Sequence, residues 1–452
     1  MLKDTPWCFS PAGTPGPADH CQNFNFVADG PGGFTDEFYQ KMYNNFVVNL
    51  DVDGSGAVVA ARDPNTPGGS YFFNWMRDAA LSIKTFIEIN DHDYSKVKDI
   101  MASYTNWVGK VQNQEDPNGN DVRIEPKFEI PSGKPYTGGW CRPQTDGPGL
   151  RANSLSLWGQ ILLTNGQKDQ AVNTVMPLIK NDLAWVTANW QSEGCDLWEE
   201  VRSNDFFWGR SSFVFALNNA ADFCDAVGDS CAADYRRVAG DIANATKSHW
   251  TGEYIGESSN RMVDGAVIHA IASFGKYLYK PSGTEAAATL AVYAKAFCEE
   301  YPINQSDNDA KVPGILIGRY RGDSYAGGNP WPLLTAGLAQ MFYSAGSEIY
   351  DQAANTKDFT LQEQHMKWAE VLNLSAESSA LELAGKFLQA GDAVMTRLWK
   401  YVKNDGGRVD EQIEKHSGNQ TSAKGLTWSY ANILHALHDR KAMVKKMTMV
   451  DM

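Results

Sequence analysis

The stretch Tyr94-Ser-Lys-Val-Lys-Asp-Ile-Met-Ala-Ser-Tyr-Thr-Asn-Trp-Val108 decides the fold class, because its apolar residues recur at alternating spacings of three and four. This period places Tyr94, Val97, Met101, Tyr104 and Val108 on one face of a helix. Thr35 has the residue type and position of an N-cap for an earlier helix. We count about a dozen helices in all, and no run alternates like a strand. The same pattern returns at 155–162, 213–223, 290–297, 334–345, 381–398 and 430–437.

Long loops separate the predicted helices at 114–148, 189–206, 312–330 and 404–424, and they are rich in Gly, Pro, Trp, Arg and Asp. Structureless loops longer than about 15 residues are uncommon in compact domains and are usually functional. Paired helices that alternate with such loops predict an all-α fold, a closed toroid of helical hairpins with the site at the loop end. No fixed-length repeat accompanies the pattern, which disfavours an open solenoid.

The composition limits the classes of partner. The chain has 452 residues, of which 43% are hydrophobic and 21% charged, and its net charge is −14. Its basic residues form no continuous stripe, so we expect neither nucleic acid nor a membrane as a partner. Aromatic residues make up 12%, and the flat faces of Trp and Tyr suit the stacking of sugar rings, although they also serve ordinary cores.

Cysteines and sequons bear on the compartment. The cysteine count of seven is odd, and only Cys8/Cys21 and Cys224/Cys231 are close enough in sequence to suggest pairs. Four Asn-x-Ser/Thr sequons, at Asn244, Asn304, Asn373 and Asn419, favour secretion, with a vacuolar or lysosomal location as the alternative. No secretory signal precedes Trp7, so such a signal has been removed or the chain is not exported.

A tight acidic cluster, Asp196-Leu-Trp-Glu-Glu200, is followed by the aromatic run Phe206-Phe-Trp208. Adjacent carboxylates repel, and aromatic surroundings raise the pKa of a carboxyl group, as a general acid near neutral pH requires. The alternative is a solvated helix start, in which the acids complement the helix dipole.

Four other loop stretches carry unusual chemistry. In Tyr71-Phe-Phe-Asn-Trp-Met-Arg-Asp78, Arg77 and Asp78 either begin a helix or bind ligand hydroxyls. The Gly- and Pro-rich loop 136–148 carries Trp140, which either plugs the loop or faces a ligand. The third is Gly318-Arg-Tyr-Arg-Gly-Asp-Ser-Tyr-Ala-Gly-Gly-Asn-Pro-Trp331, and the fourth is Asp410-Glu-Gln412 with Thr427-Trp-Ser-Tyr430.

Two carboxylates from distant loops, together with stacking aromatics, suit glycosidic hydrolysis, in which one acid protonates the leaving oxygen and one base or nucleophile acts opposite it. Glu199 and Glu411 are the candidates. The eight histidines show no metal-ligand spacing beyond His435/His438, which is more typical of a solvated face. We therefore expect neither a metal nor an organic cofactor.

Taken together, these stretches resemble the fungal-type glucoamylases of glycoside hydrolase family 15, collinearly from about residue 36 to 438. The resemblance implies an (α/α)6 barrel and an inverting exo-hydrolase that releases β-glucose from non-reducing ends of starch and maltooligosaccharides. It assigns Glu199 as the general acid and Glu411 as the general base. The residues implied to bind or enclose the sugar are Tyr71, Arg77, Asp78, Trp140, Trp198, Glu200, Arg319, Trp331 and Trp428; Asp196, Gln412 and Ser422 would support them.

Some features depart from the family pattern. Residues 1–34 read as an irregular arm before a single catalytic domain over 35–440, with no starch-binding module after it. Cys141 stands where a small residue is expected, and residues 202–205 differ where the second glucose binds, so the preference for 1,4 or 1,6 linkages stays open. The alternatives are a glucodextranase- or trehalase-like enzyme on the same fold and a catalytically inactive glycan-binding relative. We expect a monomer.

Overall fold

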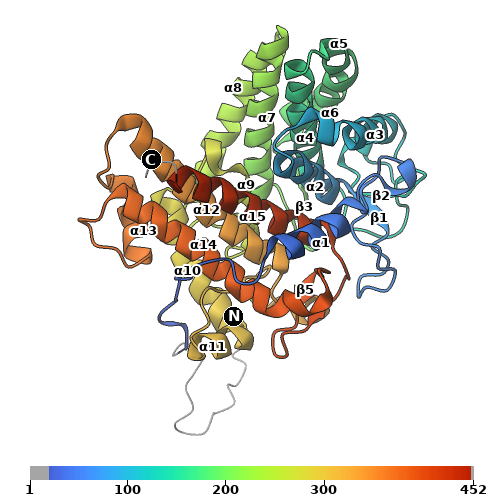
Figure 1. The fold of residues 1–452 in the computed structure, drawn as a ribbon. Helices are drawn as coiled ribbons and strands as arrows, with labels where there is room; N and C mark the ends of the chain where they lie inside the picture. The colour runs from blue at the N-terminus through green and yellow to red at the C-terminus, as the bar shows by residue number, and fades with distance from the viewer. Residues whose placement is uncertain (1–19, 449–452) are drawn as a thin grey trace.

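The computed structural model describes residues 20–448 (Figure 1). Six helices form a closed inner ring, in which each contacts the next in chain order and the last contacts the first. In chain order they are α2 (Met76–Ile89), α4 (Asp146–Thr164), α7 (Phe207–Val227), α9 (Gly265–Phe274), α12 (Pro332–Thr356) and α15 (Thr427–Thr448).

Six further helices alternate with the inner ones along the chain. They are α1 (Asp36–Val47), α3 (Tyr94–Gln112), α6 (Met176–Asn189), α8 (Cys231–Thr246), α10 (Thr284–Glu300) and α14 (Ala380–Val402). The three shorter helices are α5 (Lys168–Gln170), α11 (Pro302–Asp309) and α13 (Met366–Val371). This alternation is an (α/α)6 barrel, so the predicted all-α toroid is confirmed.

The outer and inner helices differ in how much of their surface is buried. The outer helix α3 buries one stripe that includes Val97, Met101, Tyr104 and Val108. The inner helix α4 buries residues on every side, from Asp146 to Leu162. At the start of α1, the Thr35 hydroxyl accepts a hydrogen bond from the Phe38 N–H at 3.3 Å, so the predicted cap is confirmed.

The four predicted long loops are present as irregular segments that precede α4, α7, α12 and α15. Three antiparallel pairs of short strands lie in or beside them: β1 (Phe73–Trp75) with β2 (Lys127–Glu129), β3 (Gly194–Cys195) with β4 (Arg202–Ser203), and β5 (Gln412–Ile413) with β6 (Gln420–Thr421). In the described part of the chain, no helix is both long and apolar enough to cross a membrane.

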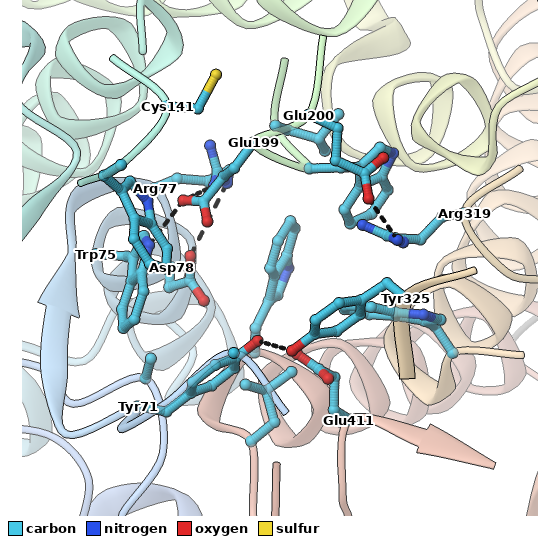
Figure 2. A pocket seen from close by; sticks show the side chains of 18 residues that line it. Tyr71, Trp75, Arg77, Asp78, Cys141, Glu199, Glu200, Arg319, Tyr325 and Glu411 are labelled. Atoms are coloured by element: carbon cyan, nitrogen blue, oxygen red, sulfur yellow. Dashed lines mark hydrogen bonds and ion pairs between the residues drawn. The ribbon is translucent and has the colours of Figure 1, made fainter. Parts of the chain in front are cut away.

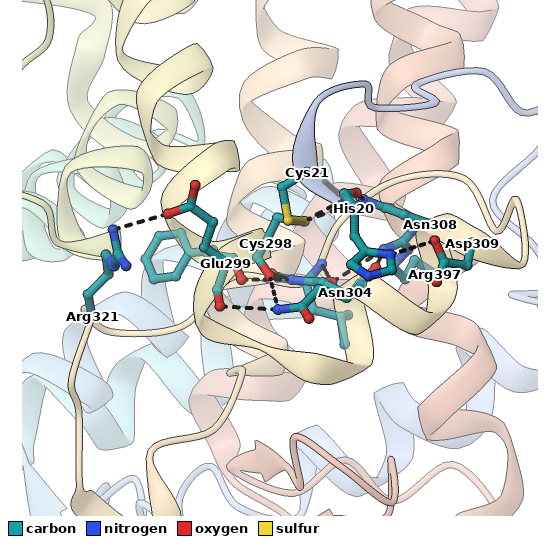
Figure 3. Close-up of a disulfide and its surroundings, with 12 residues drawn as sticks. His20, Cys21, Cys298, Glu299, Asn304, Asn308, Asp309, Arg321 and Arg397 are labelled. Carbon is teal, nitrogen blue, oxygen red and sulfur yellow. Dashed lines mark hydrogen bonds and ion pairs between the residues drawn. A yellow bond between two sulfur atoms is a disulfide. The ribbon is translucent and has the colours of Figure 1, made fainter. Parts of the chain in front are cut away.

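The first described residues, from His20 to Phe34, pack against the barrel. Cys21 forms a disulfide with Cys298 in α10 (Figure 3), so the suggested Cys8–Cys21 pair is wrong; Cys8 itself lies outside the described residues. A link across 277 residues cannot be deduced from spacing. Cys224 pairs with Cys231 as predicted, and Cys141 pairs with Cys195. The division into an arm and one catalytic domain stays a prediction.

Candidate active site

A cavity of about 270 Å³ lies at the end of the barrel where the long loops gather (Figure 2). Its volume is near the small end of ligand pockets, which span roughly 300–1,000 Å³. All eleven predicted catalytic and binding residues line it: Tyr71, Arg77, Asp78, Trp140, Trp198, Glu199, Glu200, Arg319, Trp331, Glu411 and Trp428. The remaining lining residues are Ala60, Gly68, Trp75, Cys141, Leu197, Tyr325 and Leu426.

Three inner helices begin at this cavity. Arg77 and Asp78 lie in the first turn of α2, Trp331 immediately precedes α12, and Trp428 lies in the first turn of α15. Helix N-termini carry unpaired N–H groups and partial positive charge, which stabilise nearby carboxylates. The first turns of these helices therefore place partial positive charge beside the cavity.

The turn that carries Glu199 is stabilised by Asp196, which is buried. Its Oδ1 accepts the backbone N–H groups of Glu200 at 2.7 Å and Val201 at 3.0 Å. Its Oδ2 lies 2.7 Å from Arg261 Nη1. Asp196 therefore supports the turn and is not a solvated side chain, whereas its role in supporting the sugar-binding residues stays a prediction.

Glu199 holds a left-handed backbone conformation with φ of 69°, an uncommon state for a residue other than glycine. Its Oε1 accepts hydrogen bonds from Trp75 Nε1 at 2.8 Å and Gln144 Nε2 at 2.9 Å. Arg77 Nη2 lies 3.6 Å from the same oxygen. One oxygen is thus surrounded by donors that cannot accept, while the side chain remains open to the cavity.

Glu200 points to a different set of partners. Its Oε1 lies 2.8 Å from Arg319 Nη2, and its Oε2 lies 2.9 Å from Arg261 Nη2. Arg319 is itself fixed by Asp323, whose Oδ2 accepts from Nε at 2.8 Å. The two neighbouring glutamates therefore differ in their direct partners: indole and amide groups donate to Glu199, whereas Glu200 pairs with two guanidinium groups.

Glu411 reaches the cavity from the segment that leads into β5, opposite Glu199 (Figure 2), and is 2% exposed. The Ser422 hydroxyl donates to its Oε2, and Gln412 Nε2 lies 3.3 Å from the same oxygen. Burial raises the pKa of Glu411, while hydrogen bonds from Ser422 and Tyr71 act in the opposite direction. Gln412 and Ser422 therefore lie where they were predicted, beside this carboxyl group.

The pKa of Asp78 is shifted more strongly than that of Glu411. Burial raises its pKa to about 7, and the charge of Glu199 adds to this, while Arg77 opposes it. Arg77 is buried and binds Gln144 Oε1 at 3.0 Å and Asp146 Oδ2 at 3.1 Å. The pair combines a fixed cation with a carboxyl group that titrates near neutral pH.

Aromatic rings form the walls. The Trp198 ring lies 5.4 Å from that of Trp331 and 6.4 Å from that of Trp428, measured between centroids. On another wall Trp75 and Trp140 are 5.7 Å apart. Among the residues described, three buried donors of cavity-lining residues have no hydrogen-bond partner: Arg77 Nε, Trp140 Nε1 and Trp331 Nε1. The flat aromatic faces of the walls suit a ring-shaped ligand.

Lys127 supports the Trp75–Trp140 wall from behind. Its Nζ lies 3.8 Å from the Trp140 centroid and 4.4 Å from that of Trp75, with Phe73 and Tyr136 at 4.3 and 4.2 Å. Burial lowers its pKa to about 8. Cation–π contacts of this kind orient rings as well as stabilise them.

Several site residues were not assigned roles from the sequence. Trp75 and Gln144 lie inside the quoted motif stretches, so their position in those motifs was an available signal. Tyr325, whose hydroxyl is 2.7 Å from that of Tyr71, lies in the third stretch. Arg261 and Asp264 had no such signal, because the segment before α9 carries no distinctive pattern.

The position of His435 differs from the prediction. His435 is not on a solvated face: it lies against Gln340 at 3.1 Å and Glu88 at 3.3 Å. Within residues 20–448, no group of three or more His, Cys, Asp or Glu side chains is arranged to hold a metal ion. That the chemistry needs no metal or cofactor stays a prediction.

Comparison with known proteins gives consistent matches. A family model described as "Glycosyl hydrolases family 15" matches residues 36–438. Glucoamylase-1 of Schizophyllum commune is 33% identical over 85% of this chain and 69% of its own length. Glucoamylase of Neurospora crassa is 30% identical over 88% of this chain and 67% of its own length. The structure of Hormoconis resinae glucoamylase superposes with a TM-score of 0.80 at 27% identity, over 90% of this chain and 73% of that one.

Proposed function

The chain belongs to glycosyl hydrolases family 15, and we propose that it releases β-D-glucose from non-reducing ends of α-1,4-glucans by inversion. Family membership makes it a glycoside hydrolase, and its relatives make it an enzyme of the glucoamylase type. Starch and maltooligosaccharides are the proposed substrates.

The observation that carries the proposal is the position of Glu199 and Glu411 on opposite sides of one small cavity. Glu199 acts as the general acid and gives its proton to the glycosidic oxygen. Glu411 acts as the general base and takes a proton from a water molecule, whose oxygen bonds to the anomeric carbon as the glycosidic bond breaks. The attack comes from the face opposite the leaving group, so configuration inverts.

The hydrogen bonds of Glu199 support the assignment of the acid proton to one of its two oxygens. Oε1 already accepts from Trp75 Nε1 and Gln144 Nε2, and neither of these N–H groups can accept a proton in return. A proton on Oε1 would meet two donor hydrogens. The acid proton therefore resides on Oε2, and this is the atom that faces the glycosidic oxygen.

The remaining lining residues would bind the terminal sugar. Arg77, Asp78, Glu200 and Arg319 provide charged partners for its hydroxyl groups, and Trp198, Trp331 and Trp428 provide flat faces. Tyr71 and Trp140 close the pocket. Because the cavity is small, it favours entry of a chain end over the middle of a polysaccharide.

We also propose a single catalytic domain over 35–440 that acts as a monomer on its glucan substrate. Three disulfides support a secreted location, since such bonds persist in oxidising compartments, and a vacuolar or lysosomal location is the alternative.

The test is the product anomer released from maltose, followed by NMR. β-Glucose should appear first, and Glu199→Gln and Glu411→Gln should each reduce kcat by at least about a thousandfold, with KM changed much less. Glu253→Gln, an exposed glutamate, is the matched control and should act like the wild type.

α-Glucose appearing first would contradict inversion, and hydrolysis that survives Glu411→Gln would overturn the assignment of the base. Parallel incubation with maltoheptaose, isomaltotriose and trehalose separates the proposed specificity from a glucodextranase- or trehalase-like one. No hydrolysis of any of the three would favour an inactive glycan-binding relative.

A further inference from the structure

The disulfide between Cys141 and Cys195 borders the catalytic cavity. Cys141 lines the cavity and follows Trp140 directly, and Figure 2 shows it on the same side as Glu199 and Glu200. Cys195 is buried in β3, one residue before the turn that carries both glutamates. The bond therefore joins the loop that carries Trp140 to the residue before the turn 196–201, here called the acid turn because it carries Glu199 and Glu200. The two cysteines are 54 residues apart in sequence.

The two segments also meet through their backbones. The Cys195 N–H donates to the Pro143 carbonyl at 2.8 Å, and Gln144 forms a parallel bridge with Cys195. On the other side of the bridge, β3 pairs with β4, which closes the acid turn. The disulfide is thus the covalent part of a junction that holds residues 141–144 beside residues 194–203.

Gln144 connects this junction to the reacting carboxyl group. Its Nε2 donates to the Cys141 carbonyl at 3.2 Å and to Glu199 Oε1 at 2.9 Å. Its Oε1 accepts from Arg77 at 3.0 Å. A displacement of the Cys141 backbone would therefore move the amide that orients the acid.

The segment before Cys141 is held at Trp140, by Trp75 and Lys127, but it has exposed residues on either side of Gly138. Thr137 and Gly139 are exposed, and a Cβ added to Gly139 would touch no other atom within 4 Å. Arg142 also restrains this backbone, since its Nη1 donates to the Gly138 carbonyl at 2.8 Å. Glycine-rich backbone has many alternative conformations, so a cross-link at its end limits the positions open to Cys141.

We propose that the Cys141–Cys195 disulfide is a positioning element for the catalytic acid and acts through Gln144. The proposal rests on the assignment of Glu199 as the acid. It predicts a loss in turnover, because the restrained group acts on the leaving oxygen in the transition state, and a smaller change in substrate binding.

The first experiment compares Cys141→Ala/Cys195→Ala with Cys224→Ala/Cys231→Ala. The control pair links the end of α7 to the start of α8 across seven residues, and none of its atoms lines the cavity. With maltoheptaose, kcat of the first variant should fall about tenfold while KM stays within threefold, and the control should keep wild-type kcat. A kcat within twofold of wild type, accompanied only by a lower Tm, would show a merely structural bond and overturn the proposal.

In a second experiment the Cys141–Cys195 bond is present while the protein folds and is broken only afterwards. The folded Cys224→Ala/Cys231→Ala protein is treated with a phosphine reductant, and the cysteines that become reactive are mapped by mass spectrometry. Loss of kcat should follow the release of Cys141 and Cys195, and re-oxidation should restore it. Full activity after complete release of both thiols would contradict the proposal.

A double-mutant cycle tests the route through Gln144. Gln144→Ala should lower kcat strongly in the wild type and much less in Cys141→Ala/Cys195→Ala, because the disulfide and the amide act in series. Additive losses would overturn the coupling. If Glu199→Gln leaves hydrolysis intact, the proposed function itself fails; if it abolishes hydrolysis while the disulfide variant keeps full kcat, only the inference about the disulfide fails.

Discussion

The indole N–H of Trp198 is directed at the carboxylate of Asp264, with Nε1 2.9 Å from Oδ1 and 3.1 Å from Oδ2. Asp264 also caps α9 by accepting from the Ala266 N–H at 2.8 Å. One aromatic wall of the cavity is therefore fixed to the start of an inner helix through one buried carboxyl group. Substitutions at Asp264 should affect both stability and the position of this wall.

The protonation of Asp264 should make stability depend on pH. Burial raises its pKa from 3.8 to about 7, although Arg261 opposes the shift. Between about pH 4 and 7 the folded state holds a proton that the unfolded state has released, so the free energy of unfolding falls as pH rises, by at most about 1.4 kcal/mol per unit for one such group. Asp264→Asn keeps an acceptor for Trp198 and should flatten this slope in urea unfolding at pH 4.5, 6 and 7.5. The exposed Asp99→Asn is the control, and an unchanged slope in Asp264→Asn would contradict the prediction.

The Ser422 hydroxyl should set the acidic limb of the activity profile. It donates to Glu411, and losing a donor to a carboxylate raises the pKa of that carboxyl group further. A base must be ionised, so activity is lost as pH falls through this pKa. In Ser422→Ala the acidic limb of kcat/KM should therefore move up by roughly one pH unit, as expected from losing a charge-assisted hydrogen bond of about 1.5 kcal/mol. Ser417→Ala, at the exposed turn between β5 and β6, should leave the limb in place; equal profiles for both variants would argue against the assignment.

For substrate binding, the planar geometry of the Arg319 guanidinium group should matter more than its positive charge. Arg319 is buried and spans Glu200 and Asp323 at 2.8 Å each, which a lysine ammonium cannot do in the same geometry. Arg319→Lys should raise KM for maltose by roughly tenfold or more, since a misplaced Glu200 weakens sugar binding. Arg321→Lys, two residues away and 52% exposed, should have little effect. Steady-state kinetics on the two variants would contradict the prediction if their KM values agree.

One of the four sequons should remain unmodified. The amide of Asn304 is fully buried, with Nδ2 2.8 Å from the Leu316 carbonyl and Oδ1 2.9 Å from the Leu316 N–H. A glycan there cannot be accommodated in the folded barrel, whereas Asn244, Asn373 and Asn419 are exposed. Peptide mapping of protein from an N-glycosylating host should find Asn304 unoccupied in the active fraction. A glycan at Asn304 on active enzyme would contradict this.

Helix prediction succeeded best where a helix buries one face. The spacing in 94–108 matches the buried stripe of α3 because the opposite side of that helix faces solvent. The predicted helical pattern began at about residue 155, whereas α4 begins at Asp146. Gly147 and Pro148 were assigned to the preceding loop, but both are buried in the helix. Helices of the inner ring are contacted from every side, so their apolar residues do not follow an amphipathic period in the sequence.

Much of the candidate site could be predicted because its residues gather in motif stretches that the fold brings to one cavity. Asp264 could not be found in this way: its role comes from a contact with Trp198, 66 residues away, and not from a local pattern. The Cys141–Cys195 bond was missed because pairing by sequence distance works only for local links such as Cys224–Cys231.

The inner ring closes only when α15 packs against α2, its last member against its first. Glu199 precedes α7 and Glu411 precedes α15, so the proposed base lies in the segment that leads into the last helix of the ring. Helices can form early during refolding without bringing the two carboxyl groups together. Recovery of hydrolysis after dilution from denaturant therefore reports the packing of α15 against α2. This recovery should lag behind the recovery of the helical circular dichroism signal.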